Sequence, residues 1–479
     1  MLSENLKSTK IIATLGPACD SESKIKKMIL AGVDVFRFNF KHADIEWHEE
    51  RIKRVNRVAK KLGYSIGILL DLQGPEIRVK LPYEELVVEK GKLYPFGDII
   101  FEKNEIGISI TYSQLINKLQ GGEKVLIEDG YYEFEVVKKG NQFYLKSKQD
   151  GIIKNKKNFN ISNVSLPFKS LTNRDLEGIK TAAQNEVDFI ALSFVRKPED
   201  ILLLKKEMKK HNLNAKIIAK IETAEAVKNI DKIILESDGV MVARGDLAVE
   251  LPMEQVPYYQ KLIINKARAN NKFVITATQM LQTMTTSRLP TRAEISDVAN
   301  ACYDKSDALM LSAESASGQY PIEAVETMKK IILFNEKKFD YDSNLTIFHS
   351  EGKEEIFAKT VVEYIKKQTE LDSKIELIIV FTETGRTARR ISTYRPFIPI
   401  IAVVPNKKIA RSLTINYGVY PLVYSEGKGR EITLDSIKKA IFYFKKKING
   451  NFQDAIILHG DYWRVKGKIT TLRFYSEVK

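Results

Sequence analysis

The chain has 479 residues, of which 44% are hydrophobic and 29% charged, and its formal net charge is +15. This length predicts more than one domain, and the composition is typical of a soluble globular protein rather than a disordered or fibrous one. No apolar run approaches the roughly 18 residues of a membrane-spanning helix, and the first residues lack the apolar segment of a secretory signal. The two cysteines, Cys19 and Cys302, offer no disulfide framework, so we expect a cytoplasmic protein with reduced thiols and no membrane partner.

The positive charge has two interpretations. It is compatible with nucleic-acid binding, but the lysines are scattered apart from small clusters at Lys154–Lys157 and Lys445–Lys447, and no RNA- or DNA-binding motif accompanies them. We therefore interpret the charge as a lysine-rich surface and expect no nucleic-acid partner. A positive field of this kind also suits small anionic substrates.

Eight short apolar segments recur along the chain, and each is followed by a stretch with helical periodicity. They are Lys10–Leu15, Val33–Phe40, Ile66–Asp71, Val187–Phe194, Lys216–Ile221, Gly239–Ala243, Phe273–Ala277 and Ala308–Leu311. Eight β–α repeats predict a closed parallel (β/α)8 barrel, in which the chemistry lies at the carboxyl ends of the strands. Acids, bases and hydroxyls stand at those ends, namely Thr14, Arg37, Asn39, Asp71, Ser193, Lys220, Glu222, Arg244, Asp246, Thr278, Ser312 and Glu314.

The distance between the third and fourth predicted strands is much longer than the others. The intervening segment alternates polar and apolar residues, as in Tyr131–Val137 and Gln142–Ser147, which is typical of antiparallel strands. We therefore predict a small β domain over residues 75–167, inserted into a barrel formed by residues 1–74 and 168–345. An insertion at the catalytic face is well placed to act as a lid.

The last part of the chain, residues 346–479, follows a predicted helix over Pro321–Asn335 and a polar linker over Asp340–Gly352. It repeats the β–α rhythm, with helices predicted at Glu355–Gln368, Arg386–Ser392, Ile409–Tyr417 and Leu434–Lys447 and strands at Ile375–Phe381, Pro399–Val404, Pro421–Tyr424 and Ala455–Leu458. This pattern predicts a C-terminal doubly wound α/β domain.

Lys220 and Glu222 alternate on one predicted strand and therefore face the same side. Asp246 follows the next strand, after Gly245, which permits a tight turn. Two carboxylates on adjacent strand ends, with vacancies filled by substrate and water, suit Mg²⁺ or Mn²⁺. The alternative is an ordinary surface ion-pair network, which the other polar strand ends disfavour.

Other candidates carry a weaker signal on their own. Arg37, Asn39 and Arg78 would favour anion binding, because an arginine fork suits phosphate. Thr278 is either a proton-handling hydroxyl or a strand-end cap. The loop Thr382–Thr387 opens a predicted helix, so it is either an anion site or an ordinary N-cap.

Several long motifs at these residues resemble the pyruvate kinase family, in order and over almost the whole chain. They are Thr9–Pro17 (TKIIATLGP), Arg37–His42 (RFNFKH), Asp71–Arg78 (DLQGPEIR), Ala219–Glu222 (AKIE), Asp238–Glu250 (DGVMVARGDLAVE), Thr276–Leu281 (TATQML), Pro290–Asn300 (PTRAEISDVAN) and Met310–Gly318 (MLSAESASG). The resemblance implies phosphoryl transfer from phosphoenolpyruvate to ADP, giving pyruvate and ATP in the last step of glycolysis.

The resemblance also implies roles for single residues. Glu222 and Asp246 would bind Mg²⁺, and Lys220 would stabilise charge on the phosphoryl group and on the enolate oxygen. Thr278 would assist enolate protonation through water. The remaining substrate and nucleotide contacts would come from Arg37 at the transferred phosphate, from Ala243, Gly245 and Asp246 at the substrate carboxylate, and from Asn39, His42, Arg78 and Arg174 at the nucleotide. The family usually has lysine at position 174.

The family further implies a homotetramer and an effector site. Ser287-Arg288-Leu289 replaces the usual Asn-Pro-Arg near a subunit contact. A sugar phosphate or nucleotide effector would bind Thr382, Thr384, Gly385, Arg386 and Thr387, and Trp463, Arg464 and Gly467 are similar to the family's C-terminal loop.

One departure concerns the activating K⁺. The family typically has Asn-Phe-Ser-His-Gly where this chain has residues 39–43 as Asn-Phe-Lys-His-Ala. The replaced serine binds K⁺ together with an asparagine, an aspartate and a backbone carbonyl, here Asn39, Asp71 and Leu72. We hypothesise that the Lys41 ammonium replaces the ion and removes the need for K⁺. Glu76 argues against this, because K⁺-independent relatives usually carry lysine there; in the alternative, Lys41 points to solvent and K⁺ still binds weakly.

Two other functions stay open at this point. A metal-dependent lyase on the same kind of barrel would handle enolpyruvate without ADP, and the inserted domain, Arg78 and His42 argue against it. A catalytically silent relative that binds nucleic acid would explain the charge, and it would give a salt-sensitive gel shift without turnover. Retention of Lys220, Glu222, Asp246 and Thr278 argues against a silent protein.

Overall fold

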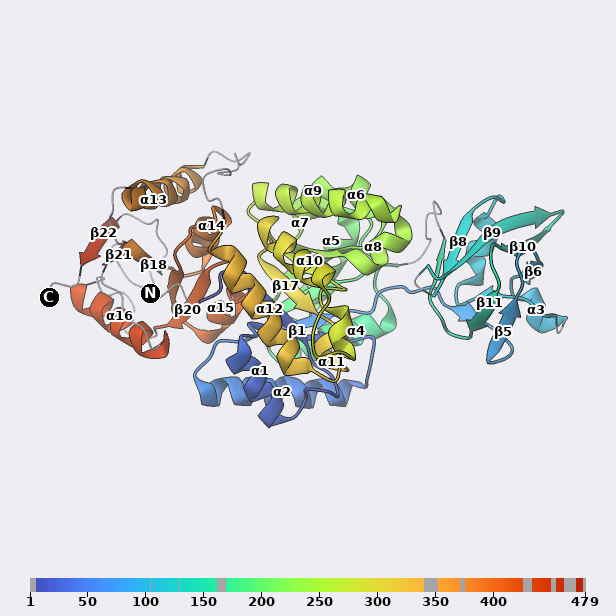
Figure 1. Ribbon diagram of the computed structural model, residues 1–479, viewed down its shortest axis with the longest axis horizontal. Helices are drawn as coiled ribbons and strands as arrows, with labels where there is room; N and C mark the ends of the chain where they lie inside the picture. Colours follow the sequence, from blue (N-terminus) through green and yellow to red (C-terminus); the bar gives the residue numbers. More distant parts are fainter. Residues whose placement is uncertain are drawn as a thin grey trace.

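Three parts lie in a row along the long axis of the computed structural model, with the barrel between the inserted domain and the C-terminal domain (Figure 1). The structure describes residues 6–103, 105–128, 130–161, 169–339, 352–370, 375–424, 433–448, 454–460 and 471–476. The predicted linker up to residue 351 and the loop with Trp463, Arg464 and Gly467 lie outside these residues. None of the described helices has both the length and the apolar character that crossing a membrane requires.

The eight predicted barrel strands are all present and close into one parallel barrel. In order around the barrel they are β1 (Lys10–Thr14), β17 (Ala308–Leu311), β16 (Phe273–Ala277), β15 (Gly239–Ala243), β14 (Lys216–Ile221), β13 (Phe189–Leu192), β3 (Gly67–Asp71) and β2 (Val35–Asn39). Apolar side chains such as Ile12, Leu69, Ile218, Met241 and Ile275 fill the interior. The barrel is therefore a packed core, and its chemistry is confined to its ends.

The helices of the barrel surround the strands and bury a second apolar layer. They are α1 (Glu22–Ala31), α2 (Ile45–Leu62), α4 (Asn173–Gln184), α5 (Pro198–Lys210), α6 (Ala224–Lys228), α7 (Ile230–Glu236), α8 (Arg244–Glu250), α9 (Val256–Ala269), α10 (Arg292–Tyr303), α11 (Ala313–Ala316) and α12 (Pro321–Glu336). At α4, Thr172 and Asp175 form a capping box, and Asp175 also accepts the backbone N–H groups of Gln73 and Gly74. The helix cap thus fixes the loop that follows β3.

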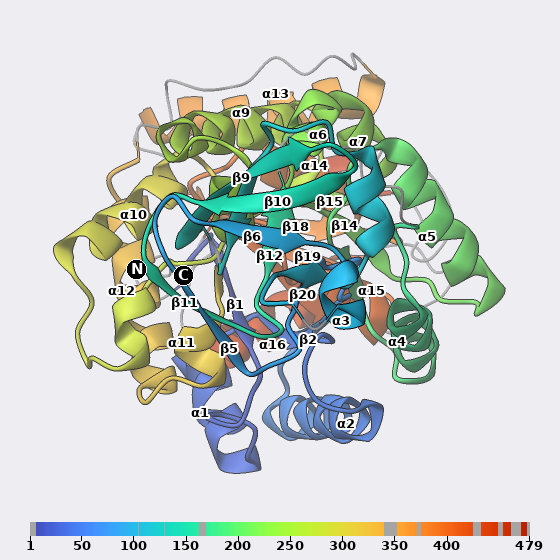
Figure 2. The same ribbon diagram turned by 90° about the vertical axis from the view of Figure 1, so that its right-hand side faces the viewer.

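The segment between β3 and β13 forms an antiparallel β domain, as its alternation predicts. A five-stranded sheet runs in the order β12 (Phe159–Ile161), β8 (Lys124–Ile127), β9 (Tyr132–Lys139), β10 (Gln142–Ser147) and β6 (Leu93–Phe96). Two short ribbons, β5 (Glu85–Val88) with β11 (Gly151–Lys154) and β4 (Val79–Lys80) with β7 (Ser109–Ile110), and the helix α3 (Ile99–Glu102) complete it around a separate apolar core. In Figure 2 this domain lies in front of the barrel, on the side of the strand ends that carry the polar residues.

The C-terminal domain has a sheet in the order β20 (Val419–Val423), β19 (Ile400–Val404), β18 (Ile375–Phe381), β21 (Asp454–His459) and β22 (Thr471–Ser476). The first four strands are parallel, as predicted, and the antiparallel edge strand β22 was not predicted. The helices are α13 (Lys353–Glu370), α14 (Arg386–Thr393), α15 (Lys407–Ser412) and α16 (Leu434–Ile448).

The helix predicted over Ile409–Tyr417 was wrong at both ends. Asn406 caps α15, which ends at Ser412, and the following residues turn instead of continuing the helix. The reason is tertiary: Ile415 is fully buried within the apolar core of the barrel interior, and it reaches that core from the C-terminal domain. The turn therefore closes the amino end of the barrel.

Candidate active site

The ammonium group of Lys220 lies among three buried side chains from neighbouring strand ends. Its Nζ is 2.8 Å from Oε1 of Glu222, 3.3 Å from Oδ1 of Asp71 and 2.7 Å from Oγ of Ser193. Lys220 and Glu222 come from β14, while Asp71 ends β3 and Ser193 follows β13. The strand alternation of the sequence therefore predicted correctly that Lys220 and Glu222 face the same side.

Arg37 extends this cluster toward β1 and β2. Its Nε and one terminal nitrogen lie 2.8 and 2.7 Å from Oδ2 of Asp71, and the other terminal nitrogen donates to Oγ1 of Thr14 at 2.9 Å. Arg37 and Thr14 occupy paired positions on adjacent strands. The guanidinium is thus held from two sides, with its plane fixed at the end of the barrel.

The charges in this cluster depend on one another. Burial alone would raise the pKa of Asp71, but Lys220 and Arg37 outweigh it and hold that pKa below its usual value. Burial would lower the pKa of Lys220, but attraction by Asp71, Glu222 and Asp246 outweighs it, so the pKa lies above the ordinary value. Lys220 is therefore a permanent cation at neutral pH.

Glu222 and Asp246 form the acidic part of the site. Burial, and then repulsion by Asp246, raises the pKa of the Glu222 carboxyl. Two mutually repelling carboxylates next to each other fit a hard divalent cation such as Mg²⁺ or Mn²⁺, which would relieve the repulsion. Within the described part of the chain, no group of three or more acidic, histidine or cysteine side chains could hold a metal, so further ligands would be water or substrate oxygens.

Thr278 lies in a constrained turn after β16. Its φ is 69°, a left-handed value that is uncommon for a β-branched residue. Its hydroxyl donates to the carbonyl of Ala277 at 2.6 Å and accepts the backbone N–H of Gly245 at 2.8 Å. Arg244 donates to the carbonyl of Thr278 at 2.7 Å and is itself paired with Asp297 at 2.6 and 2.7 Å. Arg244 thus supports the strained turn.

The loop after β2 is held by a residue far away in sequence. Nε of Arg174 donates to the carbonyl of Phe40 at 2.7 Å, and a terminal nitrogen of the same guanidinium donates to the carbonyl of Ala43. Ala43 has a φ of 62°, and Oδ1 of Asn39 accepts the backbone N–H of Lys41 at 3.3 Å. The family resemblance predicts Arg174 at the nucleotide; in the structure it supports the loop that carries two of the other predicted nucleotide residues, Asn39 and His42.

Lys41 and Arg78 share one carboxylate. The Lys41 ammonium forms an ion pair with Oε1 of Glu76, and Arg78 donates to Oε2 of Glu76 at 3.0 and 2.7 Å. Arg78 also donates to the carbonyl of Lys156 in the inserted domain at 2.9 Å. His42, next to Lys41, is an exposed residue, and partial desolvation of its imidazole, followed by repulsion from Lys41, lowers its pKa. This network joins the loop after β2 to the inserted domain.

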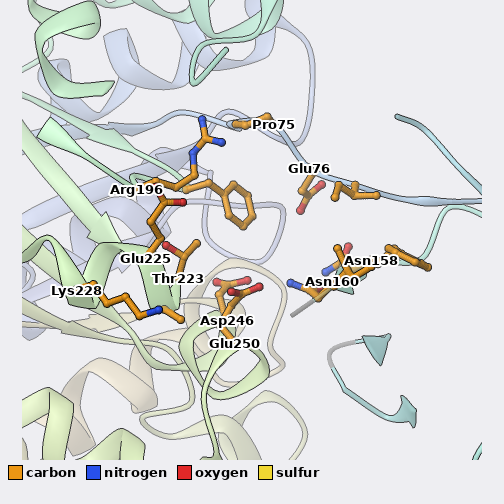
Figure 3. A pocket seen from close by; sticks show the side chains of 15 residues that line it. Pro75, Glu76, Asn158, Asn160, Arg196, Thr223, Glu225, Lys228, Asp246 and Glu250 are labelled. Carbon is orange, nitrogen blue, oxygen red and sulfur yellow. The ribbon is translucent and has the colours of Figure 1, made fainter. Parts of the chain in front are cut away.

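A cavity of about 390 Å³ lies between the barrel and the inserted domain. Phe194 and Asp246 line it from the barrel and Glu76 and Asn160 from the inserted residues, and Figure 3 shows the carboxylates of Glu76 and Asp246 directed toward this space. Glu250 of α8 accepts a hydrogen bond from the side chain of Asn160, and burial raises the pKa of Glu250. The volume lies in the range of small-molecule sites.

The structure thus brings most predicted substrate and metal residues to one end of the barrel. They are Arg37, Asn39, Asp71, Leu72, Lys220, Glu222, Ala243, Gly245, Asp246 and Thr278, all in or directly after β2, β3, β14, β15 and β16. The predicted effector residues lie elsewhere, in the C-terminal domain. There Oγ1 of Thr382 accepts the N–H of Gly385, whose φ is 75°. No side chain caps the first turn of α14, so the structure differs from an ordinary threonine N-cap, and Thr384, Arg386 and Thr387 flank that turn.

Some contacts of the site were not assigned from the sequence. Ser193 and Arg244 were noted only as polar strand ends, and their partners are in distant segments that no local pattern reveals. The backbone N–H of Phe194 donates to Oε2 of Glu222 at 2.6 Å, and a backbone contact has no side-chain signal. Glu76 was noted only as an obstacle to the Lys41 hypothesis, although it bridges Lys41 and Arg78.

Comparisons with known proteins agree with this geometry. A family model described as the pyruvate kinase barrel domain matches residues 6–325, and one described as the pyruvate kinase alpha/beta domain matches residues 362–474. A pyruvate kinase of Bacillus licheniformis is 39% identical over 466 residues, which cover 95% of this chain and 77% of the relative. One of Clostridium acetobutylicum is 39% identical over 444 residues, covering 91% and 93%.

A solved structure supports the same assignment. The crystal structure of a pyruvate kinase from Cryptosporidium parvum superposes with a TM-score of 0.89 at 33% identity, covering 99% of this chain and 97% of that one. The family is also the one that the sequence motifs predict. The chain therefore belongs to the pyruvate kinase family, the enzymes that use phosphoenolpyruvate and ADP to form pyruvate and ATP.

Proposed function

We propose that Lys220 is the central catalytic cation of this enzyme and that Glu222 and Asp246 hold Mg²⁺ or Mn²⁺ beside it. The observation that carries the proposal is the buried position of the Lys220 ammonium, within 3.3 Å of Asp71, Glu222 and Ser193. When bound, the divalent ion neutralises charge on the phosphate and enolate oxygens. Phosphoryl transfer depends mainly on positioning and charge stabilisation, which fixed cations supply.

The residues around Lys220 have complementary roles. Arg37 binds the transferred phosphoryl group, since Asp71 and Thr14 fix its guanidinium. Backbone groups of Ala243, Gly245 and Asp246 bind the substrate carboxylate. After transfer the enolate takes up a proton at carbon to become pyruvate.

That proton arrives through water on the side of Thr278. The Thr278 hydroxyl bonds the N–H of Gly245 and the carbonyl of Ala277, an arrangement that can orient a water. The substrate carboxylate and the incoming proton therefore meet where the carboxyl ends of the neighbouring strands β15 and β16 lie side by side.

The nucleotide binds between the barrel and the inserted domain. Asn39, His42 and Arg78 face the diphosphate, and Arg174 supports the loop that carries Asn39 and His42. The barrel of residues 1–74 and 168–345 carries the chemistry, and the inserted residues 75–167 act as a lid. The contacts between lid and barrel that favour this role are Glu76 to Lys41 and Asn160 to Glu250.

Lys41 substitutes for the activating K⁺. The pocket consists of Asn39, Asp71 and the carbonyl of Leu72, and it would otherwise need a monovalent cation. The Lys41 side chain is 24% exposed and pairs with Glu76, which supports a position inside the network rather than in solvent. In this arrangement the charge of Glu76 is already compensated, so its presence is compatible with independence from K⁺.

The enzyme assembles as a homotetramer in the cytoplasm and responds to an effector. Leu289, Tyr258 and Met253 are 74, 64 and 72% exposed, and they are the kind of apolar residues that a subunit contact would cover.

Both cysteines are buried and free, as in a reducing compartment. Residues 346–479 form the effector and assembly domain, and a sugar phosphate or nucleotide binds at the uncapped start of α14 through Thr382, Thr384, Gly385, Arg386 and Thr387.

The test is pyruvate formation from phosphoenolpyruvate and ADP with Mg²⁺, run in K⁺-free buffer and again with KCl. Equal rates support both the reaction and Lys41 as the built-in cation. A large increase with KCl keeps the catalytic site but removes that role from Lys41. No rate with Mg²⁺ or Mn²⁺ in either buffer contradicts the proposed site.

A further inference from the structure

The hydroxyl of Ser193 connects the catalytic lysine to the neighbouring strand. Its Oγ accepts a hydrogen bond from Nζ of Lys220 at 2.7 Å and donates its own proton to the carbonyl of Leu72 at 2.7 Å. Ser193 is only 2% exposed. The other acceptor near its proton, Oδ1 of Asp71, is farther away at 3.4 Å. Because the hydroxyl has a single proton, which the nearer Leu72 carbonyl receives, the oxygen presents a lone pair to the ammonium. Three strand ends, of β3, β13 and β14, are thus joined by one chain of hydrogen bonds.

Phe194, the next residue, contacts Glu222, which is one of the two proposed metal ligands. Phe194 has a φ of 53°, and in this left-handed conformation its backbone N–H donates to Oε2 of Glu222 at 2.6 Å. The Ser193–Phe194 turn therefore contacts Lys220 through a side chain and Glu222 through the backbone. Gly74 makes the close approach feasible, because a Cβ on it would lie 2.9 Å from the Cβ of Ser193.

The partners of Lys220 determine what it can do. An ammonium has three N–H bonds, and among the residues that the structure describes Ser193, Glu222 and Asp71 offer acceptors within 3.3 Å. When Glu222 coordinates a divalent cation, the metal competes with the ammonium for its lone pairs, whereas Ser193 is neutral and has no such competing role. Without the serine hydroxyl, the ammonium would be drawn more strongly to Glu222, in competition with the metal.

We propose that Ser193 is a positioning residue, which holds the Lys220 ammonium by a contact that does not compete with metal binding at Glu222 and fixes it relative to the Leu72 carbonyl of the predicted monovalent-cation pocket. This inference rests on the proposed roles of Lys220 and Glu222. It adds that one buried hydroxyl links the lysine that acts on the phosphoryl group to the predicted monovalent-cation pocket, while the backbone N–H of the next residue, Phe194, holds the metal ligand Glu222.

The experiment compares Ser193→Ala, Ser193→Thr and Lys220→Met with the wild-type enzyme. Ser315→Ala is the matched control: this serine, in α11, is also buried and donates to a backbone carbonyl, that of Thr14 at 2.9 Å, but no contact joins it to Lys220. For each variant we measure kcat and KM for phosphoenolpyruvate, the dissociation constant of Mn²⁺ without substrate, and the thermal midpoint. Ser193→Cys, which keeps the volume but forms weaker hydrogen bonds, replaces the alanine variant if that one does not fold.

We expect Ser193→Ala to lower kcat about tenfold or more with little change in KM, and to weaken Mn²⁺ binding about tenfold. Ser193→Thr, which keeps the hydroxyl, should recover most of both losses, and Ser315→Ala should change neither. Mn²⁺ binding equal to wild type in Ser193→Ala, or losses in Ser193→Thr as large as in Ser193→Ala, would overturn the role of the hydroxyl. Full activity of Lys220→Met would instead contradict the proposed function itself, so the two failures are distinguishable.

Discussion

The carboxylate of Asp188, at the start of the fourth barrel strand, joins the barrel to the C-terminal domain through Arg411. Nε of Arg411 donates to Oδ1 of Asp188 at 3.0 Å, and the backbone N–H of Ile68 on the neighbouring strand donates to Oδ2 at 2.9 Å. One buried carboxylate therefore accepts a backbone N–H of the neighbouring strand and also anchors the C-terminal domain. An aspartate that accepts a backbone N–H in the same way precedes every second strand of the barrel.

Counted along the chain, the second, fourth, sixth and eighth barrel strands (β2, β13, β15 and β17) each follow directly on an aspartate. Each of these four aspartates accepts the backbone N–H of the second residue of the preceding barrel strand. The pairs are Asp34 with Ile11, Asp188 with Ile68, Asp238 with Ile217, and Asp307 with Val274, at 2.8 to 3.0 Å. Each carboxylate also has a basic partner, respectively Lys7, Arg411, Lys216 and Arg395. Two of these four cations come from the C-terminal domain, which explains how that domain is fixed to the amino end of the barrel.

Titration of Asp188 should make the stability of the fold depend on pH. Burial, opposed by Arg411, raises the pKa of Asp188 to about 6. A carboxyl with a higher pKa in the folded than in the unfolded chain stabilises the fold when protonated, so its contribution is complete below about pH 4 and is lost as the pH rises through about 6. Relative to wild type, Asp188→Asn should therefore gain about 2–3 kcal/mol of unfolding free energy between pH 4 and pH 7.

Urea unfolding at these two pH values measures that difference. Asp238→Asn is the matched control, because Asp238 has the same place in the repeat but its side chain is 36% exposed. An Asp188→Asn protein whose stability changes with pH in parallel to wild type would contradict the assignment to Asp188.

Arg395 should be the strongest single anchor between the two domains. It is 5% exposed and contacts both oxygens of Asp307, at 3.1 and 2.9 Å. Replacement by methionine leaves a buried carboxylate without its cation, so we expect a loss of about 3–5 kcal/mol in unfolding free energy. Arg57→Met, which removes a solvent-exposed pair with Glu22, should leave the unfolding free energy almost unchanged. Equal losses of unfolding free energy in both variants would show that the burial of an ion pair does not determine how much it stabilises the fold.

Much of the fold follows from local pattern. All eight barrel strands are predicted because each is a short apolar run buried on both faces, and the alternation in Tyr131–Val137 predicts an antiparallel strand. The failures are tertiary. Thr471–Ser476 alternates exposed and half-buried residues at the edge of a sheet, so its apolar signal is weak. The helix predicted to Tyr417 stops early because Ile415 packs inside the barrel.

The candidate site likewise contains residues that local pattern predicts and contacts that it does not. Residue type and strand-end position predict Lys220, Glu222 and Asp246, because barrel geometry alone brings them together. No local pattern predicts that Arg174 bonds the carbonyls of Phe40 and Ala43, since these groups come from segments more than a hundred residues apart. Support contacts of this kind depend on the path of the whole chain.

Lys220→Met should abolish phosphoryl transfer without unfolding the protein. The variant loses the only cation that contacts both Asp71 and Glu222 among the described residues, while Arg37 still compensates Asp71. We expect kcat to fall at least about a hundredfold, with an unchanged far-ultraviolet circular dichroism spectrum. Lys124→Met, which removes a surface lysine paired with Glu133, should retain full activity. Turnover near that of wild type in Lys220→Met would remove the lysine from the mechanism.

Lys41→Ser should make the enzyme dependent on K⁺. In the native chain the Lys41 ammonium pairs with Glu76, and Arg78 contacts the same carboxylate. Serine would return a neutral ligand to the loop and leave Glu76 with one cation fewer, so a monovalent ion gains both a ligand and an uncompensated charge. We expect the rate in K⁺-free buffer to fall at least about tenfold and to recover with KCl, since one missing charge contact costs roughly 1.5–3 kcal/mol. The measurement is a KCl titration of the steady-state rate, with NaCl at equal ionic strength as the salt control and Lys124→Ser as the lysine control. A Lys41→Ser enzyme with the same response to KCl as wild type would mean that the ammonium does not replace the ion.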